Sequence, residues 1–271
     1  MMRVISYGGG VQSTALCVLA VQGKIGKVDA ALFANVGDDS EHPATCSYVR
    51  EVMQPWCAER GVDVHEWQRT DGAGIPMTLW THMLKEGSRS LPIPVRMSGN
   101  GMPGTRSCTV DYKIKVVGKW LKAHGASTAT PATVLIGFST DEAHRASNRR
   151  ATGYEIAEHP LLDLHYHRED CKRIIERAGL PVPPKSACFF CPFHRPKLWS
   201  RMRRDEPVLF WKSVELEQTL NDRRDLLGKD RVYLTRFGKP LDQACPVMQD
   251  DLLGFLEDPD ADSCDEGYCW T

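Results

Sequence analysis

Three consecutive glycines near the start of the chain separate one apolar run from another, in the segment ISYGGGVQSTAL. Residues 2–7 predict a buried strand, and residues 13–22 predict the helix that follows it. Glycine permits positive φ angles and a close approach of the backbone to a ligand. Free N–H groups at a helix start favour anions. The segment therefore predicts a phosphate-binding loop, against the alternative of a glycine-rich turn without a ligand.

The loop differs from the two best-known nucleotide-binding loops. No Gly-Lys-Ser/Thr follows the glycines, so the loop is not a Walker A motif. The spacing G-x-G-x-x-G of dinucleotide-binding proteins is also absent. We expect hydroxyl donors from Ser6, Ser13 and Thr14 to assist the backbone N–H groups.

Strand and helix patterns alternate along the first two thirds of the chain. Further strands are predicted at 29–36, 62–67 and 134–139, and further helices at 43–60, 111–125 and 167–179. Such alternation predicts an α/β fold with a doubly wound parallel sheet. A loop or insertion rich in Gly, Pro and Ser, with one short helix, is expected at about 71–104.

A proline cluster near residue 180 predicts a domain boundary. We therefore expect a nucleotide-binding domain over 1–180 and a cysteine-rich, mainly helical region over 181–271. Helical patterns dominate this second region at about 196–227.

The cysteine content is high for a chain of 271 residues, at ten cysteines. The N-terminus shows no secretory signal, and no apolar run approaches the roughly 20 residues of a membrane span, so a cytoplasmic protein is expected. Disulfides are disfavoured in the cytoplasm, where surplus cysteines indicate metal binding or catalysis. Four cysteines in helical patterns are expected to be structural instead: Cys17, Cys46, Cys57 and Cys171.

The motif Cys188-Phe-Phe-Cys191 can present two thiolates to one metal ion from a tight turn. Cys108, which lies between basic residues, is the candidate third ligand or a reactive thiolate. Cys269 or Cys264 is the candidate fourth ligand, and Cys245 is a weaker one. A [4Fe–4S] cluster, a structural Zn²⁺ ion and no metal remain alternatives.

Six segments resemble the PP-loop ATP pyrophosphatase and phosphoadenosine phosphosulfate (PAPS) reductase-like superfamily, in the same order along the chain. They are SYGGGVQS (6–13), ALFANVGDDSEHPAT (31–45), TRSCTVDYKIKVV (105–117), IGFSTDEAHR (136–145), the cysteine motif KSACFFCPFH (185–194) and CDEGYC (264–269). The resemblance implies a Rossmann-like PP-loop (HUP) fold that binds ATP. Gln12 stands where the loop of this superfamily carries an acidic residue that assists Mg²⁺-bound ATP.

The residues and the resemblance together assign candidate roles. Catalysis is assigned to Lys113, Asp141, Arg145 and Cys108, with Asp141 as an Mg²⁺ ligand and the cations as phosphate ligands. An ordinary helix start is the alternative explanation for Asp141 and Arg145. The nucleotide is assigned to Ser6, Gly8, Gly9, Gly10, Gln12, Ser13, Thr14, Phe33, Asp38 and Gly137.

The function that these assignments predict is ATP-dependent sulfur transfer. The enzyme would adenylate an acceptor, a nucleobase or a nucleic acid, and a sulfur nucleophile would then displace AMP. The first alternative is a sulfonucleotide (PAPS or APS) reductase that uses a C-terminal cysteine. The second is a nucleotide-binding module with a structural zinc ion. The net charge of −1 does not indicate general nucleic-acid binding. A local basic cluster at 195–204 is the feature that favours a nucleic-acid partner.

Overall fold

The computed structural model describes residues 1–99, 101–148 and 152–245. Its contacts divide these residues into two compact units. Unit 1 comprises residues 1–76 and 109–187, and unit 2 comprises residues 77–108 and the described residues from 188 onward. Most of the expected insertion at 71–104 is therefore part of unit 2.

Unit 1 is an α/β unit with a five-stranded, all-parallel sheet in the order β3-β2-β1-β5-β6. The strands are β1 (Arg3–Tyr7), β2 (Ala30–Asn35), β3 (Val64–Gln68), β5 (Ala132–Ile136) and β6 (Glu155–Glu158). The chain winds outward in one direction from β1 to β3 and returns to the other side of β1 with β5 and β6. This order is compatible with the doubly wound fold predicted from the sequence.

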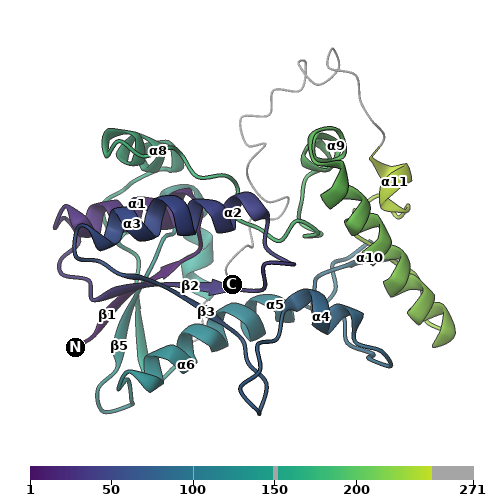
Figure 1. The fold of residues 1–271 in the computed structure, drawn as a ribbon, viewed down its shortest axis with the longest axis horizontal. Coiled ribbons are helices and arrows are strands. Elements are labelled where there is room, and N and C mark those ends of the chain that lie inside the picture. Colours follow the sequence, from purple (N-terminus) through teal and green to yellow (C-terminus); the bar gives the residue numbers. More distant parts are fainter. Residues whose placement is uncertain (100, 149–151, 246–271) are drawn as a thin grey trace. The chain divides into compact units, whose positions relative to one another are not determined.

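Helices cover both faces of the sheet (Figure 1). One face carries α1 (Val11–Val21), α8 (Arg168–Arg177) and a helix assembled from α2 (Pro43–Ser47), the π-helical η1 (Tyr48–Met53) and α3 (Gln54–Ala58). The other face carries α6 (Lys115–Ala123), which continues the π-helical η2 (Val110–Ile114). Unit 1 also contains the 3₁₀ helix η3 (Thr140–Asn148) and α7 (Pro160–Asp163), and the short α5 (Ser107–Thr109) spans the boundary between the units along the chain.

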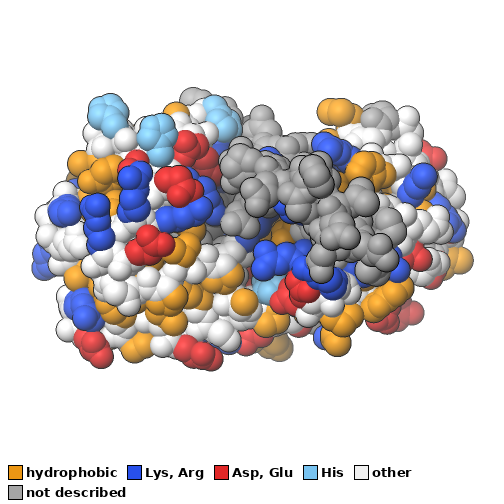
Figure 2. All heavy atoms as spheres, turned by 90° about the horizontal axis from the view of Figure 1, so that it is seen from above, with side chains coloured by type: hydrophobic (Ala, Val, Ile, Leu, Met, Phe, Trp, Pro, Cys, Tyr) orange, Lys and Arg blue, Asp and Glu red, His pale blue; other side chains and the backbone are white. Residues whose placement is uncertain are grey.

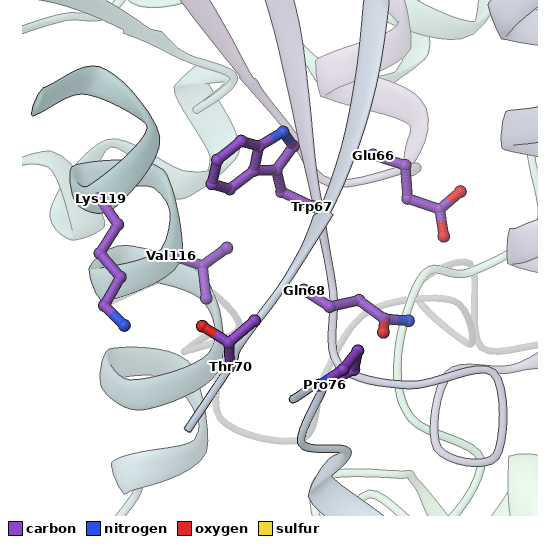
Figure 3. Close-up of a pocket in the computed structure, with 7 residues that line it drawn as sticks. All are labelled: Glu66, Trp67, Gln68, Thr70, Pro76, Val116 and Lys119. Carbon is purple, nitrogen blue, oxygen red and sulfur yellow. The ribbon is translucent and has the colours of Figure 1, made fainter. Parts of the chain in front are cut away.

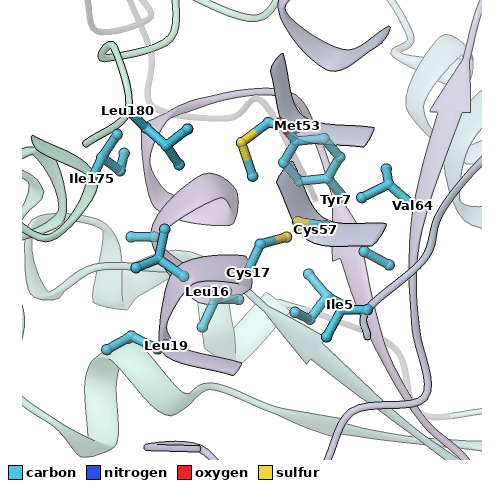
Figure 4. Close-up of a cluster of buried hydrophobic side chains, with 14 of the residues drawn as sticks. Ile5, Tyr7, Leu16, Cys17, Leu19, Met53, Cys57, Val64, Ile175 and Leu180 are labelled. Carbon is cyan, nitrogen blue, oxygen red and sulfur yellow. The ribbon is translucent and has the colours of Figure 1, made fainter. Parts of the chain in front are cut away.

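The core beneath α1 is apolar and fully buried (Figure 4). Cys17 and Cys57 face each other there beside Tyr7, and the hydrogen bond with Cys57, together with burial, raises the pKa of the Cys17 thiol well above its usual value. Cys46 and Cys171 are buried as well. These four cysteines are core residues.

Unit 2 is mainly helical and contains one small two-stranded sheet. Its helices are α4 (Leu79–Leu84), α9 (Pro196–Asp205), α10 (Pro207–Leu226) and α11 (Leu241–Ala244). Strands β4 (Arg96–Met97) and β7 (Val232–Tyr233) pair in antiparallel fashion. Among the described residues of both units, no helix is long and apolar enough to cross a bilayer.

Candidate functional site

The glycine loop lies at the point where the strand order of the sheet reverses. β1 pairs with β2 on one side and with β5 on the other, and all three strands run parallel. The segments that follow these strands, at 8–10, 36–42 and 137–139, therefore meet at the carboxyl edge of the sheet. Ligands of open α/β sheets bind at such a reversal.

Two glycines permit close backbone packing at this edge. Gly9 has a φ angle of +75°, and a Cβ atom on it would lie 2.8 Å from Cγ2 of Thr45. A Cβ atom on Gly137 would lie 3.0 Å from the backbone C of Gln12 and the backbone N of Ser13. Both positions require glycine, because any side chain would displace the loop or the start of α1.

Some backbone hydrogen-bonding groups of the glycine loop are paired with side chains of the protein. The Gly8 N–H donates to Oγ of Ser13 (3.1 Å), which in turn donates to the Gly10 carbonyl (3.1 Å). The Ser186 hydroxyl donates to the Gly8 carbonyl. Gly10 is the N-cap of α1 and has no side chain that could cap it.

The next three N–H groups remain available to a ligand. Within the described residues, the backbone N–H groups of Gly9, Gly10 and Val11 donate to no acceptor. They follow one another at the positive end of the α1 dipole, which is an arrangement that suits an anion.

Four residues predicted to contact the nucleotide are buried or already hydrogen-bonded within the protein. Thr14 is fully buried and shares a hydrogen bond of 3.3 Å with the Tyr7 hydroxyl, so its hydroxyl faces the core. Phe33 is 1% exposed and lies beside Tyr7, where it supports Gly9 from within the core and cannot flank an exposed adenine ring. The Ser13 hydroxyl is used inside the loop, and Ser6 is nearly buried at 9% exposure.

Gln12 links the loop to two distant segments. Its side-chain Nε2 donates to Glu142 Oε2 (3.2 Å), and a longer contact of 3.5 Å joins the same atom to the Ser139 hydroxyl. Its Oε1 accepts from Nη1 of Arg168 (3.1 Å). Sequence reasoning did not single out Arg168, because no local motif marks a residue that approaches the loop from 156 positions away.

The carboxylates after β5 are already engaged. Asp141 accepts from the Arg168 backbone N–H (2.7 Å) and lies 2.9 Å from Nδ1 of His167. These donors outweigh partial burial and lower the pKa of Asp141. Glu142 pairs with Arg145 at 2.5 Å, so the ion pair of Arg145 is with Glu142 and not with Asp141.

Arg145 is 3% exposed and its guanidinium lies 4.8 Å from the Phe138 ring centre. Among the described residues, Glu142 and Gln12 connect Arg145 to the loop. A role as a positioning residue fits this burial better than direct phosphate contact.

A second group of charges follows β2. Arg50 donates to both Asp38 oxygens and to both Glu66 oxygens, at 2.6 to 2.9 Å. Asn35 donates to the same two carboxylates at 2.7 Å. Arg50 is the main cause of the lowered pKa of Asp38. Asp38 therefore holds the turn after β2, which leaves little of its charge for a cation.

Glu41 and Lys113 form an ion pair beneath this turn. The Glu41 side chain is fully buried, and its Oε1 lies 3.3 Å from Nζ of Lys113. Neither carboxylate oxygen accepts an aligned hydrogen bond from the described residues, and the buried hydroxyl of Thr45 has no partner among them. The ion pair holds the Lys113 ammonium group at Glu41, four residues before Thr45, whose side chain lies next to Gly9.

In unit 2, the motif Cys188–Cys191 forms a tight turn in an aromatic environment. The Cys191 N–H donates to the Cys188 carbonyl (3.1 Å), and Nε2 of His194 lies 2.9 Å from the same carbonyl. The rings of Phe189 and Phe190 lie 5.7 Å and 5.6 Å from that of Trp80. The two residues between the cysteines therefore exclude water from one side of the motif.

Arg106 interacts electrostatically with Cys108 and with both cysteines of this motif. Burial lowers the pKa of Arg106, whereas Cys108, Cys191 and Cys188 act in the opposite direction. Nη1 of Arg106 is buried without a hydrogen-bond partner among the described residues, and the guanidinium lies 5.2 Å from the Phe193 ring centre. Sulfur acceptors close to this partly buried guanidinium offset part of its desolvation.

The donor chemistry of these three cysteines fits a thiophilic metal centre. Within the described ranges, however, no three His, Cys, Asp or Glu side chains are grouped closely enough to form a metal site. The candidate fourth ligands, Cys264 and Cys269, lie outside the described residues.

A cavity of about 410 Å³ in unit 1 lies beside the edge strand β3 (Figure 3). Trp67, Val116 and Lys119 line one side of it, and Thr70 and Pro76 lie at the end of β3. Sequence reasoning did not predict this cavity. The residues assigned to the nucleotide do not line it.

The charged side chains do not form a single basic surface in the view of Figure 2. Lysine and arginine side chains of the described residues alternate there with acidic side chains. Within α9, Arg204 and Arg201 both pair with Asp205.

Comparisons of the chain with protein-family models, with curated proteins and with solved structures found no significant match.

Proposed function

We propose that the protein is an ATP-dependent adenylating sulfurtransferase of the PP-loop class. The observation that carries this proposal is the uncapped start of α1, with the free N–H groups of Gly9, Gly10 and Val11 at the reversal of the sheet. Such a turn binds the phosphates of a nucleotide through the backbone and the helix dipole. The ordered set of motifs that resembles PP-loop proteins supports ATP as the nucleotide.

The reaction has two steps, adenylation of the acceptor and displacement of AMP by sulfur. A carbonyl oxygen of the acceptor, a nucleobase either free or within a nucleic acid, attacks the α-phosphorus of ATP, and pyrophosphate leaves. A hydrosulfide ion then attacks the activated carbon, AMP leaves with the former carbonyl oxygen, and loss of the sulfur's proton gives the thiocarbonyl product. The backbone N–H groups of the loop and the ammonium group of Lys113 would stabilise the charge that develops on the phosphates.

The cysteines of unit 2 support the second step. Cys108, Cys188 and Cys191 would hold a [4Fe–4S] cluster or a Zn²⁺ ion, with Cys269 as the fourth candidate ligand. A cluster held by Cys108, Cys188 and Cys191 alone would leave one iron open to the sulfur that is transferred, whereas Cys269 as a fourth ligand, or a zinc ion, would leave a centre that only holds the thiolates. The positive charge of Arg106 would balance the net negative charge of either centre.

The test is an assay of anaerobically purified protein with ATP, Mg²⁺ and a sulfide donor, with and without RNA or free nucleobases. We expect release of both pyrophosphate and AMP, and sulfur in the acceptor by mass spectrometry. Reduction of APS or PAPS by thiols without ATP consumption would replace this proposal with a sulfonucleotide reductase. Nucleotide binding without turnover, together with bound zinc, would indicate a binding module.

A further inference from the structure

We propose that Arg168 binds the terminal phosphates of the nucleotide and thereby makes the site select a triphosphate over a monophosphate. This inference rests on the proposed nucleotide binding at the glycine loop. It adds to that function a specificity-determining residue that the sequence motifs do not contain.

Two anchors hold Arg168 beside the loop. Its backbone N–H donates to Oδ2 of Asp141 (2.7 Å), which fixes the first residue of α8 against the segment after β5. Its guanidinium Nη1 donates to Oε1 of Gln12 (3.1 Å), the second residue of α1. The guanidinium is therefore held next to the helix start whose N–H groups are free.

The charge of this guanidinium is not neutralised by the described residues. Two other cations of α8 are paired with carboxylates, Lys172 with Glu169 (2.6 Å) and Arg173 with Asp170 (2.9 Å). Across the described part of the chain, Arg168 forms no ion pair, and its side chain forms one hydrogen bond, to a neutral amide. A guanidinium has five N–H donors, so most of its donors remain available for a phosphate.

The neutrality of Gln12 is essential to this arrangement. An amide oxygen orients the guanidinium through a hydrogen bond and leaves its full positive charge. A carboxylate at the same position would form an ion pair with Arg168 and remove most of the attraction for an anion. The absence of the acidic residue expected in this loop is therefore explained by a cation held within the chain.

The experiment compares binding of ATP, ADP and AMP by isothermal titration calorimetry in the presence of Mg²⁺. It uses the full-length wild type and the variants Arg168→Gln, Arg168→Lys and Arg173→Gln. Arg173 lies on the same helix and pairs with Asp170, so it is the matched control for a lost charge on α8. Thermal unfolding and AMP affinity show whether each variant remains folded.

For Arg168→Gln we expect an ATP affinity lower by about tenfold or more, the effect of losing a charge-assisted hydrogen bond, and an AMP affinity nearly unchanged. Arg168→Lys should recover part of the loss, and Arg173→Gln should match the wild type. An ATP affinity of Arg168→Gln within about twofold of the wild type would overturn the inference alone. A wild type that binds no adenine nucleotide would instead overturn the proposed function.

Discussion

Gly137 lies where the end of β5 meets the first turn of α1, and its missing side chain sets their separation. We expect Gly137→Ala to push the loop away from the sheet, because the new Cβ atom would lie 3.0 Å from two backbone atoms. The free energy of unfolding should fall by about 1–3 kcal/mol, as in other overpacked sites. Nucleotide affinity should fall as well.

Urea unfolding and nucleotide titration test this expectation. Gly72→Ala is the matched control in unit 1, because a Cβ atom there has no neighbour within 4 Å and the φ angle is not positive. A Gly137→Ala variant with the stability and nucleotide affinity of the control would show that the close packing at 137 is not needed.

The buried pair of Glu41 and Lys113 couples stability to the site. Lys113→Met would leave the fully buried Glu41 carboxylate without its cation, so we expect a loss of about 3–5 kcal/mol in the free energy of unfolding. The double variant Glu41→Gln/Lys113→Met should regain most of this stability, because the unpaired charge is gone. Chemical denaturation of both variants measures the difference.

Activity separates the two roles of Lys113. If its ammonium group stabilises charge on the phosphates, the double variant should be stable and still slow in pyrophosphate release. Recovery of both stability and pyrophosphate release in the double variant would assign Lys113 a purely structural role.

At the scale of the elements, the hydrophobic pattern of the sequence correctly predicted the first three strands of unit 1. Strands were predicted at 2–7, 29–36 and 62–67, and the structure has them at Arg3–Tyr7, Ala30–Asn35 and Val64–Gln68. Strand β6 was not predicted. It has only four residues, with a glutamate at each end, and its pairing with β5 fixes its conformation.

Within unit 2, Glu217 connects α10 to two later segments. Its carboxylate oxygens accept from the Leu234 N–H (2.6 Å) and from the Leu241 N–H (2.8 Å). Burial nevertheless raises the pKa of Glu217 to about 7. The folded state therefore holds its proton more tightly than the unfolded state does.

This proton linkage predicts that stability falls as pH rises. The contribution of protonated Glu217 is complete below the unfolded pKa of about 4.5 and is lost as pH rises through about 7, a change of about 3 kcal/mol. Urea unfolding at pH 5 and pH 8 should show this difference. Glu217→Gln, which cannot titrate, should be less dependent on pH over this range, and equal slopes would contradict the prediction.

At the scale of the whole molecule, the division into two units separates the two candidate chemistries. The glycine loop and its charged neighbours belong to unit 1, whereas Cys108, Cys188 and Cys191 belong to unit 2. If the cysteines bind a metal, metal binding should stabilise unit 2 directly, because ligand binding to the folded state adds to stability.

Hydrogen exchange and metal analysis of Cys188→Ala test this assignment. We expect lower metal content and weaker amide protection in unit 2, with protection of β1 and α1 in unit 1 unchanged. Cys171→Ala is the control, since it removes a buried cysteine that is not a candidate ligand. Equal metal content in the wild type and in Cys188→Ala would exclude this cysteine as a ligand.

The sequence by itself determined the alternation of strands and helices, the glycine turn after β1 and the cysteine motif of unit 2. These features follow from local periodicity, from the freedom of glycine and from close spacing along the chain. Tertiary structure alone decided that 77–108 joins unit 2, that Thr14 and Phe33 face the core, and that Arg168 reaches Gln12. The physical reason is that burial and long-range hydrogen bonds depend on which segments meet in space, and single-chain periodicity carries no information about those encounters.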